Sequence, residues 1–373
     1  MLTGPQGDNA QVQTRPRRYA LAVELTSHCN QRCTYCYNAW REDNGKGVGA
    51  LASDDLCALL DRALTEVEFD HVTLTGGEPF VRPDIWRVLD LCRDRGVGIQ
   101  MISNGGLIDD AVAARLAGYR IRCIQITLDG PNASLHHEHV GGDDHWEPTL
   151  AGIRALVRHG VCVVGCIVVT RKNAELVGET LDLFRSLGVE IVALSRFSPA
   201  GYAANHAAAL LPSRTDVITA LGQGEQRGRE HGMDLQVTMP VPPCVVDHAE
   251  YPHVRFGSCP IGTEMQEFAL GPRGELRSCT LHTEELGDAR TSSMADLVQS
   301  PKLTAYRDVT PEFCAPCPHR TSCMGGCGAA AATMLGDPRA LDPFVAQHVD
   351  DAFAARLADA RAGSPRVRLP VTA

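Results

Sequence analysis

The sequence has no apolar run long enough to cross a bilayer. Its longest, GVCVVGCIVV at residues 160–169, falls far short of the ~20 residues that a membrane-spanning helix needs. The N-terminus is polar and does not resemble a secretory signal. These two observations predict a cytoplasmic protein that makes no membrane contact.

Basic residues are too few and too scattered to form a nucleic-acid-binding surface. Lys and Arg number 35 against 45 Asp and Glu, which gives a formal net charge of −10. The basic pairs Arg17-Arg18 and Arg171-Lys172 build no stripe that could follow a phosphate backbone. The charge pattern therefore predicts no nucleic-acid partner and favours small molecules or peptides.

The composition is that of an ordinary globular chain. Of its 373 residues, 44% are hydrophobic and 21% are charged, so the chain can bury a core. The length suits one large domain plus a smaller one, or one barrel with an extension. No internal repeat stands out at a period of about 20 to 50 residues.

Cysteine is abundant, with 15 residues. The cytoplasm keeps thiols reduced, so metal binding, catalysis or burial must account for these cysteines rather than disulfides. Five of them fall on apolar helix faces or in strand-like runs and are expected to be buried without a function: Cys57, Cys92, Cys123, Cys162 and Cys166.

Short β-rich runs alternate with helix-period segments from about residue 19 to 196. The expected strands lie at 19–25, 71–75, 98–103, 123–129, 161–170 and 190–195. Helical periodicity appears at 56–63, 85–92, 150–157, 176–184 (with Asn173 as a cap) and, further on, near 214–231. This pattern predicts an α/β fold, either an open doubly wound sheet or a partial barrel, with its chemistry at the C-terminal ends of the strands.

The first expected strand leads directly into SHCNQRCTYC, which contains Cys29, Cys33 and Cys36. A structural zinc site would need a fourth ligand, and His28 is the sole near candidate. Three thiolates instead suit a four-iron cluster with one iron left free. The second strand ends in TGGEP at 75–79, where two glycines would let a ligand approach the backbone and Glu78 would offer a carboxylate to a cationic amine.

TGGEP alone is weak evidence, but together these motifs resemble those of radical S-adenosylmethionine (SAM) enzymes. The resemblance implies a partial (β/α)6 TIM-like barrel, a [4Fe-4S] cluster bound by the three cysteines, and reductive cleavage of SAM to a 5′-deoxyadenosyl radical that abstracts a substrate hydrogen atom. It also implies the cofactor-binding positions Tyr35, Gly76, Gly77, Glu78, Pro79, Ser103, Asn104, Thr127 and Asp129. No residue is identified as a catalytic acid or base. The required low potential lies within the range of iron–sulfur clusters, which extends to about −700 mV.

Seven cysteines lie between residues 244 and 327 in a Gly- and Pro-rich stretch. In isolation this stretch would be read as a double zinc ribbon. Following a radical SAM core, it resembles a SPASM extension, a C-terminal Cys-rich iron–sulfur domain with two auxiliary Fe-S clusters. The resemblance implies that one cluster is bound by Cys259, Cys279 and Cys327, and the other by Cys314, Cys317 and Cys323.

The SPASM pattern ends in one further cysteine, where this chain has Val345. Asp337, Asp342 and His348 are the nearest alternative ligands for the second cluster. Cys244 has three interpretations: a ligand of the first auxiliary cluster, a buried structural thiol, or a hydrogen-atom donor.

The segment HHEHVGGDDHW contains His136, His137, His139 and His145. It could bind metal, but a solvated loop near the cleft is the favoured interpretation. The expected domains are an N-terminal tail at 1–18, the barrel with its connecting helix at 19–240, the SPASM domain at 241–345, and a C-terminal helix and tail at 346–373, of which the last ten residues look loose.

The favoured function is oxidative, cross-linking or epimerising modification of a ribosomally made peptide or protein. Only about eighteen residues precede the first strand, so a separate peptide-recognition protein is expected, along with an electron donor such as ferredoxin or flavodoxin. The alternative is a dehydrogenase or epimerase of a small natural-product intermediate, such as an aminocyclitol or a sugar, with Arg154 and Arg196 in the cleft. A zinc-binding interaction module is the third hypothesis, and TGGEP argues against it.

Overall fold

The computed structural model describes residues 19–38, 40–41 and 49–362. The expected tail at 1–18 and the last ten residues lie outside this part of the chain. No helix within the described ranges is both long and apolar enough to span a membrane.

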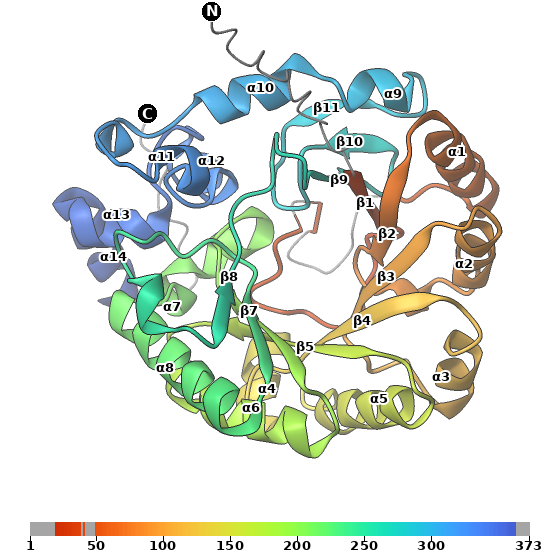
Figure 1. Ribbon diagram of the computed structural model, residues 1–373, viewed down its shortest axis with the longest axis horizontal. Coiled ribbons are helices and arrows are strands. Elements are labelled where there is room, and N and C mark those ends of the chain that lie inside the picture. The colour runs from red at the N-terminus through yellow and green to blue at the C-terminus, as the bar shows by residue number, and fades with distance from the viewer. Residues whose placement is uncertain (1–18, 39, 42–48, 363–373) are drawn as a thin grey trace, which may run out of the picture.

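Six parallel strands in consecutive order form the core of the sheet. They are β1 (Tyr19–Glu24), β2 (Phe69–Thr75), β3 (Gly98–Ser103), β4 (Ile121–Thr127), β5 (Val163–Val169) and β6 (Ile191–Arg196). Figure 1 shows the strands curving into a ring with helices on the outside. The predicted strands and the partial-barrel fold are thereby confirmed.

The outer helices are α1 (Ser53–Glu66), α2 (Ile85–Asp94), α3 (Asp110–Leu116), α4 (Ala133–Val140), α5 (Trp146–Arg158), α6 (Val177–Ser186), α7 (Ala207–Leu210) and α8 (Arg214–His231). Short 3₁₀ helices lie between them at η1 (Pro79–Val81), η2 (Ala174–Leu176) and η3 (Gly201–His206). The apolar stripe of α1 is buried as its periodicity predicts, with Leu56 and Leu60 at 3% and 0% exposure.

Two details of the helix prediction are wrong or incomplete. Asn173 does not cap a long helix: its Oδ1 accepts from the backbone N–H of Thr170 at 2.8 Å, and α6 begins at Val177. Helices α3 and α4 were not predicted, although each has a side-chain cap. Asp109 accepts from the N–H of Val112, and Asn132 caps α4 in the same way.

The sheet continues beyond the six core strands at both edges. After β6 come β7 (Asp234–Val237) and β8 (Val254–Phe256), both parallel. On the other edge β9 (Glu267–Leu270) pairs parallel with β1, followed by the antiparallel strands β10 (Glu275–Arg277) and β11 (Glu285–Asp288). The cysteine-rich segment therefore contributes strands to the barrel sheet instead of forming a sheet of its own.

Short helices complete the C-terminal part. They are η4 (His248–Glu250), α9 (Met294–Leu297), α10 (Pro301–Asp308), η5 (Glu312–Cys314), α11 (Arg320–Cys323), α12 (Gly328–Leu335), α13 (Pro343–Val349) and α14 (Asp351–Ala362). Figure 1 shows α10 to α14 along the side of the ring between β8 and β11. This segment thus covers the side that the strands leave open.

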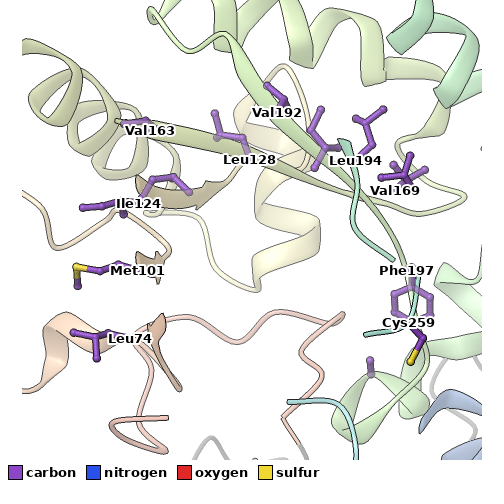
Figure 2. Close-up of a cluster of buried hydrophobic side chains, with 14 of the residues drawn as sticks. Leu74, Met101, Ile124, Leu128, Val163, Val169, Val192, Leu194, Phe197 and Cys259 are labelled. Atoms are coloured by element: carbon purple, nitrogen blue, oxygen red, sulfur yellow. The ribbon is translucent and has the colours of Figure 1, made fainter. Parts of the chain in front are cut away.

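One hydrophobic core joins the barrel to the C-terminal segment. Barrel residues such as Leu74, Ile124 and Val192 are fully buried and belong to the same cluster as Cys259. Figure 2 shows Cys259 beside Phe197, which directly follows β6. A thiol expected in the second module therefore packs against the barrel.

Candidate active site and thiol clusters

The three leading cysteines line one cavity of about 230 Å³ inside the ring. They lie on the loop after β1, and the other lining residues come from the same loop, from the ends of neighbouring strands and from the loop after Cys279. Among the positions predicted to bind cofactor, the lining includes Tyr35, Gly76, Gly77, Ser103, Asn104 and Thr127. Residues that sequence analysis expected to be distributed over four strands are thus gathered around one space.

The TGGEP turn is fastened to the cysteine loop by its backbone. The N–H of Gly77 donates to the carbonyl of Thr26 at 2.7 Å, and the N–H of Glu78 donates to the carbonyl of His28 at 2.8 Å. A Cβ on Gly77 would lie 1.9 Å from the His28 oxygen, and Gly76 has a φ of +129°. The turn and the cysteine loop therefore approach each other at the backbone, which requires glycine at both positions, and both glycines also line the cavity.

Glu78 lies behind the cavity lining and is 1% exposed. Its Oε1 accepts from the hydroxyl of Ser103 at 2.9 Å and the N–H of Phe80 at 3.1 Å, and its Oε2 accepts from the N–H of Asn104 at 2.8 Å. Burial raises its pKa to about 7. Glu78 therefore fixes the ends of two strand loops, whereas direct contact with a cationic amine was expected. Pro79 is buried beside it and is also outside the lining.

The three thiols of the loop face one another. Burial raises the pKa of the Cys33 thiol well above its usual range, and the neighbouring Cys29 and Cys36 raise it further. Burial likewise raises the pKa of Cys29 to about 12. Three neighbouring thiols would repel one another as thiolates, so a positively charged group must compensate their charge.

Arg41 supplies one such charge, and sequence analysis did not identify it. Its guanidinium interacts with the Cys36 thiol, donates to the carbonyl of Cys33 at 2.8 Å and lies 4.3 Å from the centroid of the Tyr202 ring. One arginine cannot balance three thiolates. An iron–sulfur cluster, whose irons bind thiolates, fits this donor set.

Tyr35 connects the cavity to a buried polar network. Its phenol interacts with Asp129 and Cys33. Asp129 is fully buried behind the lining, where its Oδ1 accepts from the N–H of Val168 at 3.1 Å. Asp129 therefore supports Tyr35 and β5 from behind, whereas a direct cofactor contact was predicted.

The expectation of a solvated histidine loop is wrong. His136 and His139 lie in α4 with 0% and 1% exposure. The Nε2 of His139 is 3.0 Å from the Thr170 hydroxyl, and burial lowers the pKa of His136 to about 3. Both imidazoles belong to the buried network beneath Tyr35, whose ring lies 6.4 Å from that of His139. The helix was not predicted because the side chains that it buries include polar histidines.

The cysteines without an expected function have different surroundings. Cys92 and Cys166 are buried as predicted, and Cys57 and Cys123 are half-buried. Cys162 is exposed, so the prediction of its burial is wrong. The reason is that Cys162 precedes the first paired residue of β5. Cys166 also lines the cavity.

Cys259, Cys279 and Cys327 form a second group of thiols. Burial raises the pKa of Cys279 to about 12, and Cys327 and Cys259 add to the shift. The hydroxyl of Ser198, beyond β6, lies 3.6 Å from the Cys327 sulfur. The phenol of Tyr306 interacts with Cys259. This group contains the three residues that the SPASM resemblance assigns to the first auxiliary cluster.

Cys314, Cys317 and Cys323 form a third group, and Cys244 belongs to it. Burial raises the pKa of Cys314 to about 11, and the neighbouring Cys323, Cys244 and Cys317 contribute smaller increases. Cys244 is exposed and interacts with Cys317. Its interpretation as a buried structural thiol is therefore contradicted, and its electrostatic neighbour is Cys317 of this third group.

The expected substitute ligands are engaged elsewhere. Asp342 caps α13 by accepting from the N–H of Phe344 at 2.8 Å, and it also accepts from the N–H of Cys327 and from Arg196. Val345 is 1% exposed in the core. Asp337 accepts from the backbone and side chain of Arg339, and His348 stacks edge-on against Phe344.

Two buried ion pairs connect the barrel to the C-terminal segment, and neither was predicted. Arg277 of β10 pairs with Glu24 at the end of β1, with side-chain exposures of 4% and 0%. Arg196 at the end of β6 pairs with Asp342 at 2.6 Å. The predicted presence of Arg196 in the cleft is correct because it lines the cavity, whereas Arg154 is exposed on α5.

Within the described ranges, no group of three or more His, Cys, Asp or Glu is close enough to hold a single metal ion. The thiolates of a four-iron cluster bind different irons, so they lie farther apart than the ligands of one zinc ion. The fit of these thiol groups is therefore judged against clusters and not against a lone ion.

Comparison with known proteins places this arrangement in context. Residues 23–184 match the family model of the radical SAM superfamily. The PqqA peptide cyclases of Methylobacterium nodulans and Methylorubrum extorquens are each 28% identical to this chain, over 344 and 355 residues. These alignments cover 90% and 92% of this chain and 88% of each relative.

Solved structures share the fold across both parts of the chain. The enzyme anSMEcpe with bound AdoMet superposes with a TM-score of 0.69 at 18% identity, covering 92% of this chain and 95% of that one. Streptococcus suis SuiB bound to its precursor peptide SuiA gives a TM-score of 0.67 at 15% identity, covering 87% and 75%. The likeness extends beyond the barrel into the cysteine-rich segment.

Proposed function

We propose that this chain is a radical SAM enzyme with a SPASM-type C-terminal segment, and that it modifies a ribosomally made peptide or protein in the cytoplasm. The observation that carries the proposal is the single cavity lined by the three loop thiols, Tyr35 and the glycine turn. Reactive groups at the C-terminal ends of barrel strands are typical of enzymes with this architecture.

In this proposal Cys29, Cys33 and Cys36 hold a four-iron cluster with one open iron, and SAM occupies the cavity. Once bound, cluster and SAM supply a 5′-deoxyadenosyl radical that takes a hydrogen atom from the substrate. Arg41 balances part of the thiolate charge.

The remaining lining residues orient SAM. The glycine turn presents backbone to its methionine end, and Ser103, Asn104 and Thr127 line the side formed by β3 and β4. Glu78 and Asp129 act from behind by fixing these loops.

A peptide is the favoured substrate because of the relatives. Two relatives of nearly full coverage are PqqA peptide cyclases, and SuiB is solved with a precursor peptide. We assign two auxiliary clusters to the groups around Cys279 and Cys314, where they would accept the substrate's second electron. The proposed partners are a ferredoxin or flavodoxin as electron donor and a separate peptide-recognition protein. The proposed domains of this chain are the barrel at 19–240 and the SPASM domain at 241–345.

Cys33→Ala tests the SAM site. We expect the anaerobically purified variant to form no 5′-deoxyadenosine and to hold about four fewer iron atoms than the wild type, which should hold about twelve in three clusters. Cys162→Ala, which removes an exposed thiol just before β5, is the matched control and should change neither value. Continued 5′-deoxyadenosine formation by Cys33→Ala would refute the site.

Mass spectrometry tests the substrate class. A short peptide encoded beside the gene should lose two hydrogen atoms per cross-link or oxidation, or gain one deuterium in D₂O if it is epimerised. Unchanged peptides together with turnover of an aminocyclitol or sugar would replace this proposal with the small-metabolite alternative.

A further inference from the structure

We infer that Cys244 is the fourth ligand of the second auxiliary cluster, so that Cys244, Cys314, Cys317 and Cys323 hold a fully coordinated [4Fe-4S] centre. This inference rests on the proposed function, in which the group around Cys314 binds an iron–sulfur cluster. It assigns a ligand that the cysteine spacing alone does not give.

Cys244 groups with three thiols that are distant from it in the sequence. Cys244 lies between β7 and β8, some seventy residues before the other three, yet its thiol interacts with Cys317, and those of Cys314 and Cys323 interact with it. Four thiols from two separate segments thus share one place. Each cysteine of a four-iron cluster binds a different iron, and a group of four satisfies all of them.

Backbone hydrogen bonds on both sides of Cys244 hold it in place. The Nε of Arg214 donates to the carbonyl of Val245 at 2.6 Å, and the N–H of Val245 donates to the carbonyl of Pro242 at 2.9 Å. On the other side, His248 contacts the carbonyl of Val241 at 2.7 Å. The thiol is therefore presented at the tip of a fixed turn whose neighbours Val245 and Val246 are buried.

The partner segment is held with comparable definition. Met324, directly after Cys323, has a φ of +56° and is the single non-glycine residue with positive φ in the described part of the chain. Such backbone strain persists where the surroundings enforce it, and it concentrates at functional sites. Gly325 follows against Pro311 and the Cys314 sulfur, 2.6 Å and 3.5 Å from where a Cβ would lie.

The expected position of the fourth ligand holds no residue free to bind iron in the described part of the chain. Val345 is part of the buried core and cannot bind metal. The carboxylate of Asp342 already accepts three hydrogen bonds, including one from Arg196, and it lies near Cys327 in the other thiol group. Complete cysteine ligation would leave no iron open to a substrate atom, so the second cluster would carry electrons only.

The test uses full-length protein lacking the SAM cluster, with Cys29→Ala, Cys33→Ala and Cys36→Ala combined. This parent should hold about eight iron atoms in two clusters. Adding Cys244→Ala should make one cluster lose an iron to ferricyanide, because the oxidation [4Fe-4S]²⁺ → [3Fe-4S]⁺ + Fe²⁺ + e⁻ needs a weakly held corner. The readouts are about one Fe²⁺ released per chain and a [3Fe-4S]⁺ signal by electron paramagnetic resonance.

Two further variants keep the test decisive. Cys244→Ser offers an oxygen ligand and should retain the iron while shifting the resonance of one reduced cluster, even if the Ala variant fails to fold. Cys162→Ala should behave as the parent. Unchanged iron and spectra in both Cys244 variants overturn the inference and leave the SAM site standing. A parent protein that holds about one zinc per chain, which the Cys244 variants lack, also overturns the inference. If the parent protein holds no iron, both this inference and the proposed auxiliary clusters are refuted. SAM cleavage by the wild type is measured separately and tests the SAM site.

Discussion

Gly77 shows how one missing side chain can join two motifs. Its backbone lies so close to His28 that a Cβ would meet the carbonyl oxygen at 1.9 Å. The TGGEP turn therefore acts as a template for the cysteine loop, and the two motifs need each other even before a cofactor binds.

We predict that Gly77→Ala displaces the cysteine loop. Overpacking of this kind costs about 1–3 kcal/mol, and we expect the variant to lose the iron of the SAM site while keeping the auxiliary iron. Iron analysis and denaturant unfolding measure both effects. Gly222→Ala, in α8 with no atom near its added Cβ, is the control. Wild-type iron content in Gly77→Ala would contradict the template role.

We also predict a pH dependence caused by Glu78. Its folded pKa is raised to about 7, so the folded state binds this proton more tightly than the unfolded state. The stabilisation is complete below about pH 4 and is lost as pH rises through 7, amounting to about 2 kcal/mol between pH 5 and 8. Glu78→Gln should flatten that decline in the unfolding free energy of the apoprotein, and exposed Glu175→Gln should not. Equal slopes for all three proteins would refute the assignment.

The residues that sequence analysis identified are those with local spacing. Cys29, Cys33 and Cys36 lie within one loop of eight residues, so their gathering follows from that loop alone. Cys244 could not be grouped with Cys317 because the pairing depends on how β7, β8 and α11 fold together. Arg41 carries no motif and was missed for the same reason.

At the scale of elements, β9 and β10 fasten the C-terminal segment to β1. Arg277 pairs with Glu24, and its guanidinium also donates to the carbonyls of Thr280 and His282 near Cys279. Trp40 donates to the same carboxylate at 2.9 Å. This buried pair therefore connects the loop of the SAM site with the loop of Cys279.

We predict that Arg277→Met destabilises the protein by about 3–5 kcal/mol, because Glu24 would remain buried without a countercharge. Denaturant unfolding under anaerobic conditions measures the loss. The control Arg273→Met removes an arginine that is 52% exposed, and it should cost less than about 1 kcal/mol. Adding Glu24→Gln to Arg277→Met should recover part of the loss. Equal costs for both arginines would contradict this account.

Strands were easier to predict than helices for a physical reason. Buried parallel strands such as β5 are continuous apolar runs, whose signal survives in any window. Helix α4 has polar residues on its buried face, including His136 and His139. Its hydrophobic periodicity therefore does not indicate which face is buried. The strands β9 to β11 are short, and their pairing with β1 depends on contacts far along the chain.

At the scale of the molecule, three thiol groups lie in regions of different packing. The loop thiols and the Cys279 group adjoin the barrel core, whereas the Cys314 group lies among short helices and turns with exposed Phe313 nearby. Such a segment has little apolar burial to order it, so bound metal should supply part of its folding free energy.

We therefore predict that iron removal loosens residues 311–327 more than the barrel. Amide hydrogen exchange in that segment should rise at least about tenfold in the apoprotein, equivalent to about 1.4 kcal/mol of local stability. Exchange in β2 should change little. Equal exchange with and without iron would show that the segment is ordered by its packing alone.

The pairing of β9 with β1 also governs how the nascent chain matures. The outer edge of β1 cannot pair with β9 until about 250 further residues have been translated. This takes roughly 10 to 50 seconds at ribosomal rates of about 5–20 residues per second. During that interval an apolar strand edge and three reactive thiols are exposed together. Cofactor loading and chaperone protection should therefore be timed to the synthesis of the last third of the polypeptide.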